Sequence, residues 1–261
     1  MNWNLVRAVI YRHMYNFKHS YDRATDVFYW PLMDILLWGF ASVYLANQSS
    51  DTPLVLLIIL SGLMLNMVMW RAQYDITVNL LEEMWAKNMI NMFASPLRLR
   101  EWIVAVIILG TIKMCMTLSM SVILALIIYK TNLFDLGFYL IPFFASLLMT
   151  GWGIGLFISG IIVYFGTKIQ TLAWSGISVI TPFSGVFYPI SVLPDWAQKV
   201  SAFLPTSYIF EGMRAVVTTH SLPLDMLAKS IILNIILIAI GLCFFIFMFG
   251  KSCEKGLARL E

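Results

Sequence analysis

Six long apolar stretches divide the 261-residue chain and constrain its fold more than any other feature. A helix needs about 20 predominantly apolar residues to cross the hydrocarbon core of a bilayer, and these stretches reach or approach that length. Backbone groups inside a bilayer must be hydrogen-bonded within the protein, which favours helices. We therefore expect an all-α polytopic membrane protein with six transmembrane helices, at residues 25–46, 53–70, 102–129, 136–165, 171–188 and 226–250. The fifth of these is interrupted around Pro182, Gly185 and Pro189.

Charged residues make up only 12% of the chain, whereas hydrophobic residues make up 60%. Soluble domains carry about 25% charged residues, so almost no part of this chain remains for a separate soluble domain. Residues 1–261 are therefore predicted to form a single transmembrane domain. The net charge of +3 is too small to indicate nucleic acid as a partner, and the three cysteines have neither metal-binding spacing nor a disulfide pattern.

Residues 2–23 combine four basic side chains with a helical apolar repeat. The repeat consists of Trp3, Val6, Ile10, Met14 and Phe17, at spacings of three and four residues. The charges extend too far from the N-terminus for a cleaved signal peptide, and the apolar run that follows is too long. We expect an amphipathic helix in the inner membrane interface.

The stretch 71–102 is too polar to cross the membrane, although it lies between two apolar runs. An apolar stripe predicts an amphipathic helix over 76–94, which Ser95-Pro96 then ends. Glu83 and Lys87 are four residues apart on the opposite face, in the order that favours an ion pair. Two interpretations remain open: the helix rests on the lipid surface, or it docks on a partner protein. The stripe consists of Leu81, Met84, Trp85, Met89, Met92 and Phe93.

The segment 189–224 is partly apolar but contains four prolines and four charged residues. No piece of it is long enough to span a bilayer. Irregular backbone at membrane depth must be shielded by protein or line a wet cavity. Short re-entrant helices that dip into the outer leaflet fit this composition.

The distribution of basic residues predicts the orientation. If the N-terminus is inside, the cytoplasmic segments hold 12 Lys and Arg residues and the outer segments hold four, while Lys113 lies in a span. Lys and Arg collect on the cytoplasmic side of membrane proteins. Both termini and the 76–94 helix are therefore expected in the cytoplasm.

The chain contains no complete motif for catalysis or ATP binding. Gly250-Lys251-Ser252 resembles the end of a phosphate-binding loop, but Phe245 stands where the first glycine of that loop is required. The three histidines form no metal-binding pattern, and the glycine-flanked serine of hydrolases is absent. We expect a transporter subunit that is not an enzyme and whose energy source lies on another chain.

These features together resemble the ABC-2 type permeases, the membrane subunits of ATP-driven exporters, also called the type V exporter group. The similarity covers nearly the whole chain and includes its order of interfacial helix, spans, cytoplasmic helix and outer segment. Ser95-Pro96-Leu97 precedes Glu101 as in that family, and 205–214 is similar to its P-x-x-Y-x-x-E-x-x-R region. In the cytoplasmic helix, the similarity is to bacterial drug-exporter-like members and rests on Glu83, Trp85, Asn88 and Asn91.

The resemblance implies a mechanism and a set of partners. Two copies of the chain would pair in the bacterial inner (plasma) membrane, surrounded by lipid, and each would bind one of two copies of an ABC ATPase subunit. The 76–94 helix would be the coupling helix, and ATP would be bound by the ATPase, so no cofactor is expected on this chain. Closure of the ATPase dimer would squeeze a cavity between the two permeases. The implied coupling residues are Glu83, Trp85, Lys87, Asn88, Asn91, Ser95 and Pro96, and the implied outer-gate residues are Pro205, Tyr208, Glu211 and Arg214.

Composition bears only weakly on the substrate. Aromatic residues make up 15% of the chain, which suits amphiphilic drugs or sugar chains but is also ordinary at lipid-facing positions. We expect a hydrophobic or amphiphilic substrate, drug-like or lipid-like, with a lipid-linked polysaccharide as the alternative. A rival from another class is a self-sufficient channel or ion-driven carrier. The polar residues available for such a path in the spans are Asp34, Asn66, Lys113 and Asn234.

Asp34 and Lys113 lie at similar depths in the first and third expected spans, which run in the same direction. At 1.5 Å of rise per residue, their depths differ by about 3 Å. Charged residues inside a bilayer pair with one another or face protein or water. Either the two side chains form an ion pair, or each faces the transport cavity separately.

Overall fold

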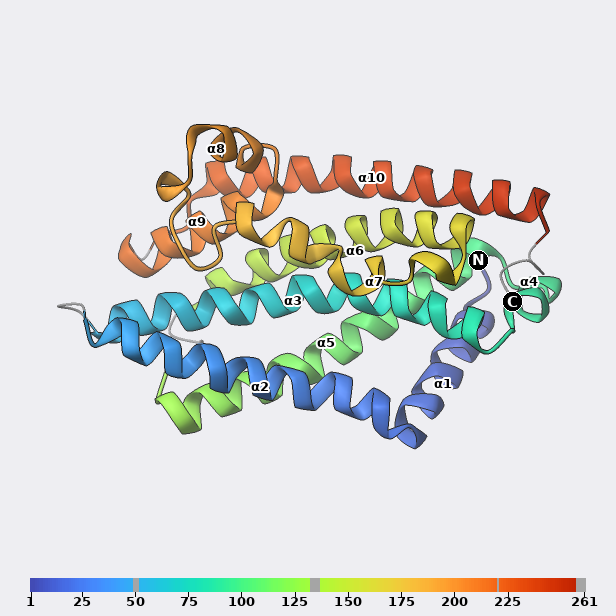
Figure 1. Cartoon of the computed structure of the whole chain (residues 1–261), viewed down its shortest axis with the longest axis horizontal. Coiled ribbons are helices and arrows are strands. Elements are labelled where there is room, and N and C mark those ends of the chain that lie inside the picture. Colours follow the sequence, from blue (N-terminus) through green and yellow to red (C-terminus); the bar gives the residue numbers. More distant parts are fainter. Residues whose placement is uncertain (49–51, 132–136, 220, 257–261) are drawn as a thin grey trace.

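Long helices lie side by side along the long axis of the molecule (Figure 1). The computed structural model describes residues 1–48, 52–131, 137–219 and 221–256. Within these ranges, five helices are long and apolar enough to cross a membrane, and no strand occurs. They are α2 (Tyr21–Ala46), α3 (Thr52–Trp85), α5 (Leu99–Tyr129), α6 (Leu140–Phe165) and α10 (Leu224–Glu254). The predicted all-α polytopic membrane fold is confirmed.

The short helices lie at the two ends of this bundle. The N-terminus, α1 (Trp3–His19) and α4 (Met89–Ala94) lie at one end, together with the end of α10 (Figure 1). At the opposite end are α8 (Asp195–Ser201) and α9 (Pro205–Thr219), which with η5 (Ile190–Val192) make up the segment before α10. Among the described residues of the segment before α10, the helices are therefore too short to span a bilayer, as expected.

The second expected span and most of the expected 76–94 helix form one continuous helix, so the boundary predicted between them is wrong. α3 runs without interruption from Thr52 to Trp85. Its polar part contains no helix breaker, and Arg71, Gln73 and Asp75 find hydrogen-bond partners inside the protein. The helix therefore does not have to end where the sequence becomes polar. It ends at Trp85, and Lys87 has a left-handed φ of 51° before α4 begins.

The fifth expected span, 171–188, is not a continuous helix. It consists of α7 (Leu172–Ser175) and two 3₁₀ turns, η3 (Ile177–Val179) and η4 (Thr181–Phe183), preceded by η2 (Thr167–Ile169). Pro182 lacks a backbone donor and Gly185 has a φ of 69°, so the expected interruption is present and a long helix is not sustained. In Figure 1 this broken segment, residues 172–188, returns from the end of α6 to the end that holds α8.

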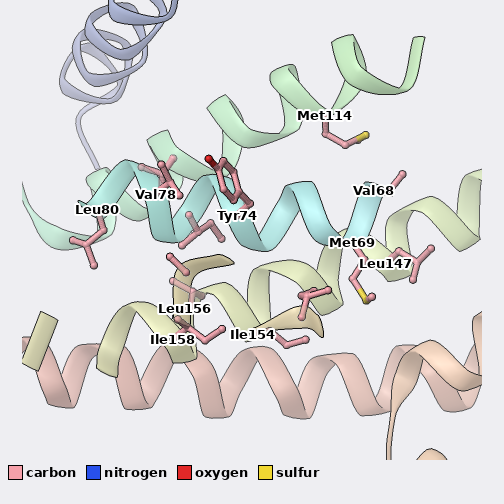
Figure 2. Packing of buried hydrophobic residues seen from close by; sticks show 14 of the residues in the cluster. Val68, Met69, Tyr74, Val78, Leu80, Met114, Leu147, Ile154, Leu156 and Ile158 are labelled. Atoms are coloured by element: carbon pink, nitrogen blue, oxygen red, sulfur yellow. The ribbon is translucent and has the colours of Figure 1, made fainter. Parts of the chain in front are cut away.

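Helix α6 lies between α3 and α10 (Figure 2), where its buried side chains include Ile154, Leu156 and Ile158. Two glycines allow the close approach to α3. A Cβ added at Gly151 would lie 2.5 Å from the Cβ of Ala72, and one added at Gly155 would lie 3.1 Å from the carbonyl oxygen of Gln73. The G-x-x-x-G pair therefore packs within the chain.

Gly151→Ala is expected to destabilise the protein by about 1–3 kcal/mol, because the new methyl group overpacks a helix contact. The carbonyl oxygen of Met69 lies 2.6 Å from the same position and cannot move without bending α3. The melting temperature of the purified protein in detergent measures the loss. Gly250→Ala is the matched control, because an added Cβ there meets no atom within 4 Å. Equal melting temperatures for the two variants would contradict the prediction.

Candidate functional site

A cavity of about 690 Å³ lies between α2, α3, α5 and the broken segment. Its volume is that of a site for a drug-sized molecule. The broken segment forms part of the wall, and Trp174, Phe187 and Tyr188 are among its lining residues. The α2 and α3 walls are formed by Asp26, Trp30, Pro31, Asp34, Trp38, Leu63, Asn66, Met67, Trp70, Arg71 and Tyr74.

Aromatic rings make up much of the cavity wall. Trp70 and Tyr74, four residues apart on α3, stack with their ring centroids 4.7 Å apart and their planes 18° apart. Trp38 of α2 stacks on Phe187 of the broken segment, with 4.6 Å between centroids. Ring faces of this kind bind bulky apolar groups. The wall suits a hydrophobic or amphiphilic molecule.

Asp34 lines this cavity and does not contact Lys113, so the ion pair that the sequence suggested is wrong. Asp34 lies about 20 Å along α2, which is about 39 Å long, and is therefore near its midpoint. Its carboxylate makes no hydrogen bond or ion pair with the residues that the structure describes. A charge at the bilayer centre costs roughly 2.5–3.5 kcal/mol on insertion scales. The alternative interpretation, in which Asp34 faces the cavity separately, agrees with the geometry.

Lys113 pairs instead with Asp75, at an Nζ–Oδ1 distance of 3.3 Å. Asp75 also accepts two hydrogen bonds from Arg71, from Nε at 2.9 Å and from Nη2 at 3.1 Å. All three side chains are buried. Asp75 escaped the sequence analysis because the helix was expected to begin after it. Its spacing of four residues from Arg71 was the signal available, since such pairs meet on a helix.

The polar residues considered for a channel do not form a common path. Asp34 and Asn66 line the cavity, whereas Lys113 lies in the buried ion cluster. Asn234 is held between α6 and α10 by hydrogen bonds with Ser146 and Thr150. Among the described residues, no three His, Cys, Asp or Glu side chains are grouped so that they would hold a metal ion.

A second charge cluster joins α1 and the start of α2 to the end of α3. Glu83 is buried and accepts a hydrogen bond from Arg12 at 2.8 Å, while Glu82 pairs with Arg23 at 3.0 Å. His13 lies between the two carboxylates, 3.3 Å from each. Sequence analysis missed this junction because its partners are far apart in the chain. The only signal in the sequence was that the segment 2–23 is basic whereas Glu82 and Glu83 are acidic.

Burial lowers the pKa of His13, but its contacts with Glu82 and Glu83 outweigh burial and raise the pKa above 6.5. The Oε1 atom of Glu83 has no other hydrogen-bond donor among the described residues. Protonated His13 therefore completes the junction. The contribution to stability is fully present below pH 6.5 and is lost as the pH rises through the higher pKa of the folded protein.

We expect the melting temperature to fall as the pH rises above about 6.5, because His13 then loses its proton in the folded protein. The other charged groups at the junction are Glu82 and Glu83, with Arg12 and Arg23 paired to them. His13→Gln should remove most of the pH dependence and lower the melting temperature at the acidic end. The same slope in His13→Gln as in the unmodified protein would contradict the assignment.

The structure divides the expected coupling residues into buried and exposed groups. Glu83 belongs to the α1–α3 junction and accepts a hydrogen bond from Asn88 at 2.7 Å. Trp85 is 43% exposed and donates a hydrogen bond to Gln170 at 3.1 Å. Its ring is nearly parallel to that of Trp174, with 6.4 Å between the ring centroids. A direct contact between Glu83 and a partner protein is therefore not supported.

The remaining expected coupling residues lie on an exposed turn, residues 86–96, which follows α3 and contains the short helix α4. Lys87 is exposed but not helical, so its expected i,i+4 pair with Glu83 is wrong. Asn91, Ser95 and Pro96 are also exposed, while Met89 and Met92 hold α4 against the core.

Glu211 and Arg214 of α9 hold the broken segment in place. Arg214 lies 3.3 Å from Glu211 and donates hydrogen bonds to the carbonyl groups of Gly185, Val186 and Tyr188. Glu211 accepts a hydrogen bond from the backbone of residue 190 at 2.7 Å. Burial lowers the pKa of Arg214, and the Glu211 charge opposes this shift. The pair is partly buried and bonded to backbone, unlike an exposed surface pair.

The other two expected gate residues make structural contacts. The Tyr208 hydroxyl donates a hydrogen bond to the Ala202 carbonyl at 3.0 Å. Pro205 is buried, and its carbonyl accepts a hydrogen bond from Ser230 of α10 at 2.9 Å. All four residues therefore contribute to the packing of the end that holds α8 and α9.

Comparison with known proteins identifies the chain at the level of its family. A search of curated proteins gives no match. The family model described as ABC-2 type transporter matches residues 6–218, which include most of α1, the cavity walls and nearly all of α9. The order of helices, the cavity and the match over most of the sequence lead to one conclusion: the chain belongs to the ABC-2 type transporter family.

Proposed function

We propose that this chain is the permease subunit of an ATP-driven exporter that moves a hydrophobic or amphiphilic molecule, drug-like or lipid-like, out across a bacterial inner membrane. The observation that carries the proposal is the aromatic cavity of about 690 Å³ in a member of the ABC-2 type transporter family. The family implies an ABC ATPase as partner. A paired arrangement, with two permeases and two ATPases, is part of the proposal.

The exposed turn 86–96 is the proposed contact with the ATPase. It lies at the same end as the N-terminus, and the excess of basic residues favours a cytoplasmic position for this end. Trp85 at the end of α3 and Tyr74 in the cavity wall belong to one uninterrupted helix and lie about 17 Å apart along its axis. A displacement of the exposed turn would therefore be transmitted along α3 to the cavity wall.

The segment with α8 and α9 is the proposed outer gate. Arg214 connects α9 to the carbonyl groups of the broken segment, which also lines the cavity. Movement of α9 would consequently change the shape of the cavity wall. This arrangement supports release of the substrate at the end opposite the ATPase.

Co-purification tests the proposal. An affinity-tagged chain should retain an ABC ATPase from the native membrane, and ATP hydrolysis by the complex should drive uptake of the substrate into inverted vesicles. Asn91→Arg in the exposed turn should reduce retention of the ATPase, whereas Lys199→Glu on α8 should not. Conduction or transport by the chain alone, without ATP, would favour a channel or ion-driven carrier and overturn the proposal.

A further inference from the structure

We propose that the cavity selects a lipophilic organic cation, with Asp34 as its counter-charge and the rings of Trp30 and Trp38 as its flanking walls. This inference rests on the proposed export function and names the substrate class of the same cavity. Three side chains of α2 line the cavity at a regular spacing, and the other charged residues of the cavity wall are paired with protein groups.

Trp30, Asp34 and Trp38 follow one another at intervals of four residues on α2. Residues at this spacing lie on one face of a helix, about one turn apart. All three line the cavity, so the wall places an indole one helical turn before the carboxylate and another one turn after it. The face of an indole attracts cations through its ring electrons, and a carboxylate attracts them through its charge.

The other charged residues of the cavity wall already have partners. Asp26 accepts a hydrogen bond from the Tyr74 hydroxyl at 2.8 Å and lies 3.9 Å from Arg23. Arg71 donates two hydrogen bonds to Asp75. Among the described residues that line the cavity, Asp34 is therefore the charged side chain without a compensating contact.

This arrangement discriminates by charge as well as by size. A neutral molecule gains contacts with the rings but leaves the carboxylate near the middle of α2 uncompensated. An anion meets the charge of that carboxylate and is repelled by it. A cation gains contacts with the rings and with the carboxylate, so it is the ligand that fits both.

Tetraphenylphosphonium and tetraphenylborate provide a matched test, because the two ions have similar size and shape but opposite charge. Binding of each ion is measured for the full chain in nanodiscs of zwitterionic lipid, with empty nanodiscs subtracted. The unmodified chain should bind tetraphenylphosphonium more tightly than tetraphenylborate. Asp34→Asn should weaken tetraphenylphosphonium binding by about tenfold or more and should not weaken tetraphenylborate binding.

Two variants control for loss of structure. Asp34→Glu keeps the charge and should retain the preference for the cation. Asp225→Asn removes an exposed carboxylate on α10, away from the cavity, and should leave the binding of both ions unchanged. Lack of cation preference in the unmodified chain, or equal effects of Asp34→Asn on both ions, would overturn the inference. Because binding is measured without an ATPase, this result is independent of whether the chain pairs with one.

Discussion

Glu83→Lys is expected to abolish the accumulation of folded protein, and not merely to uncouple transport. Glu83 is 1% exposed and lies against Arg12, His13 and Asn88. A lysine there would add a further positive charge beside Arg12, His13 and Arg23, and it would remove the hydrogen-bond acceptor. Breaking a buried pair so that a charge is left uncompensated costs about 3–5 kcal/mol. That is a large share of the stability of a typical domain.

The folded yield after size-exclusion chromatography and the melting temperature measure this effect. Glu83→Gln should cause a smaller loss, because the amide oxygen still accepts hydrogen bonds while only the charge disappears. Lys87→Glu at the exposed turn is the control for a nearby change of charge and should leave the yield unchanged. Normal yield and stability of Glu83→Lys, with loss of ATPase binding alone, would show that Glu83 contacts the partner and would contradict our assignment.

Arg214→Glu is expected to eliminate export while the chain still inserts and assembles. The substitution removes the donor for three carbonyl groups, at Gly185, Val186 and Tyr188, and places a second carboxylate beside Glu211. Hydrogen bonds to a charged group contribute about 1.5–3 kcal/mol each, so their combined loss should loosen the broken segment. The wall of the cavity would then no longer be held by α9.

Hydrogen exchange of the backbone over residues 183–190 measures the loosening directly, and a vesicle export assay measures its consequence. Arg214→Lys keeps the charge but lacks the planar group that reaches several carbonyls, so an intermediate result is expected. Lys199→Glu on the exposed face of α8 is the control for charge at the same end. Unchanged exchange and full export in Arg214→Glu would indicate that the pair is dispensable.

The amino-acid sequence by itself determined the membrane class, the positions of most of the long helices and the family. Each depends on local information. A long apolar run with few charges has to form a helix in lipid, because the backbone has no other way to satisfy its hydrogen bonds. The interruption near Pro182 and Gly185 was also visible, because proline and glycine act on the backbone where they stand. The short helices before the last span followed in the same way from the prolines.

The tertiary structure alone decided which polar side chains meet. Glu83 and Arg12 are 71 residues apart in the chain, and Lys113 and Asp75 are 38 apart. No local pattern specifies such pairs, which is why Asp34 was matched with Lys113 on depth alone. The end of the second span was misplaced for the same reason: charges predict an exit from the membrane unless partners on other helices compensate them. Whether a charged residue marks the water's edge or a buried cluster depends on those partners, and only packing brings them together.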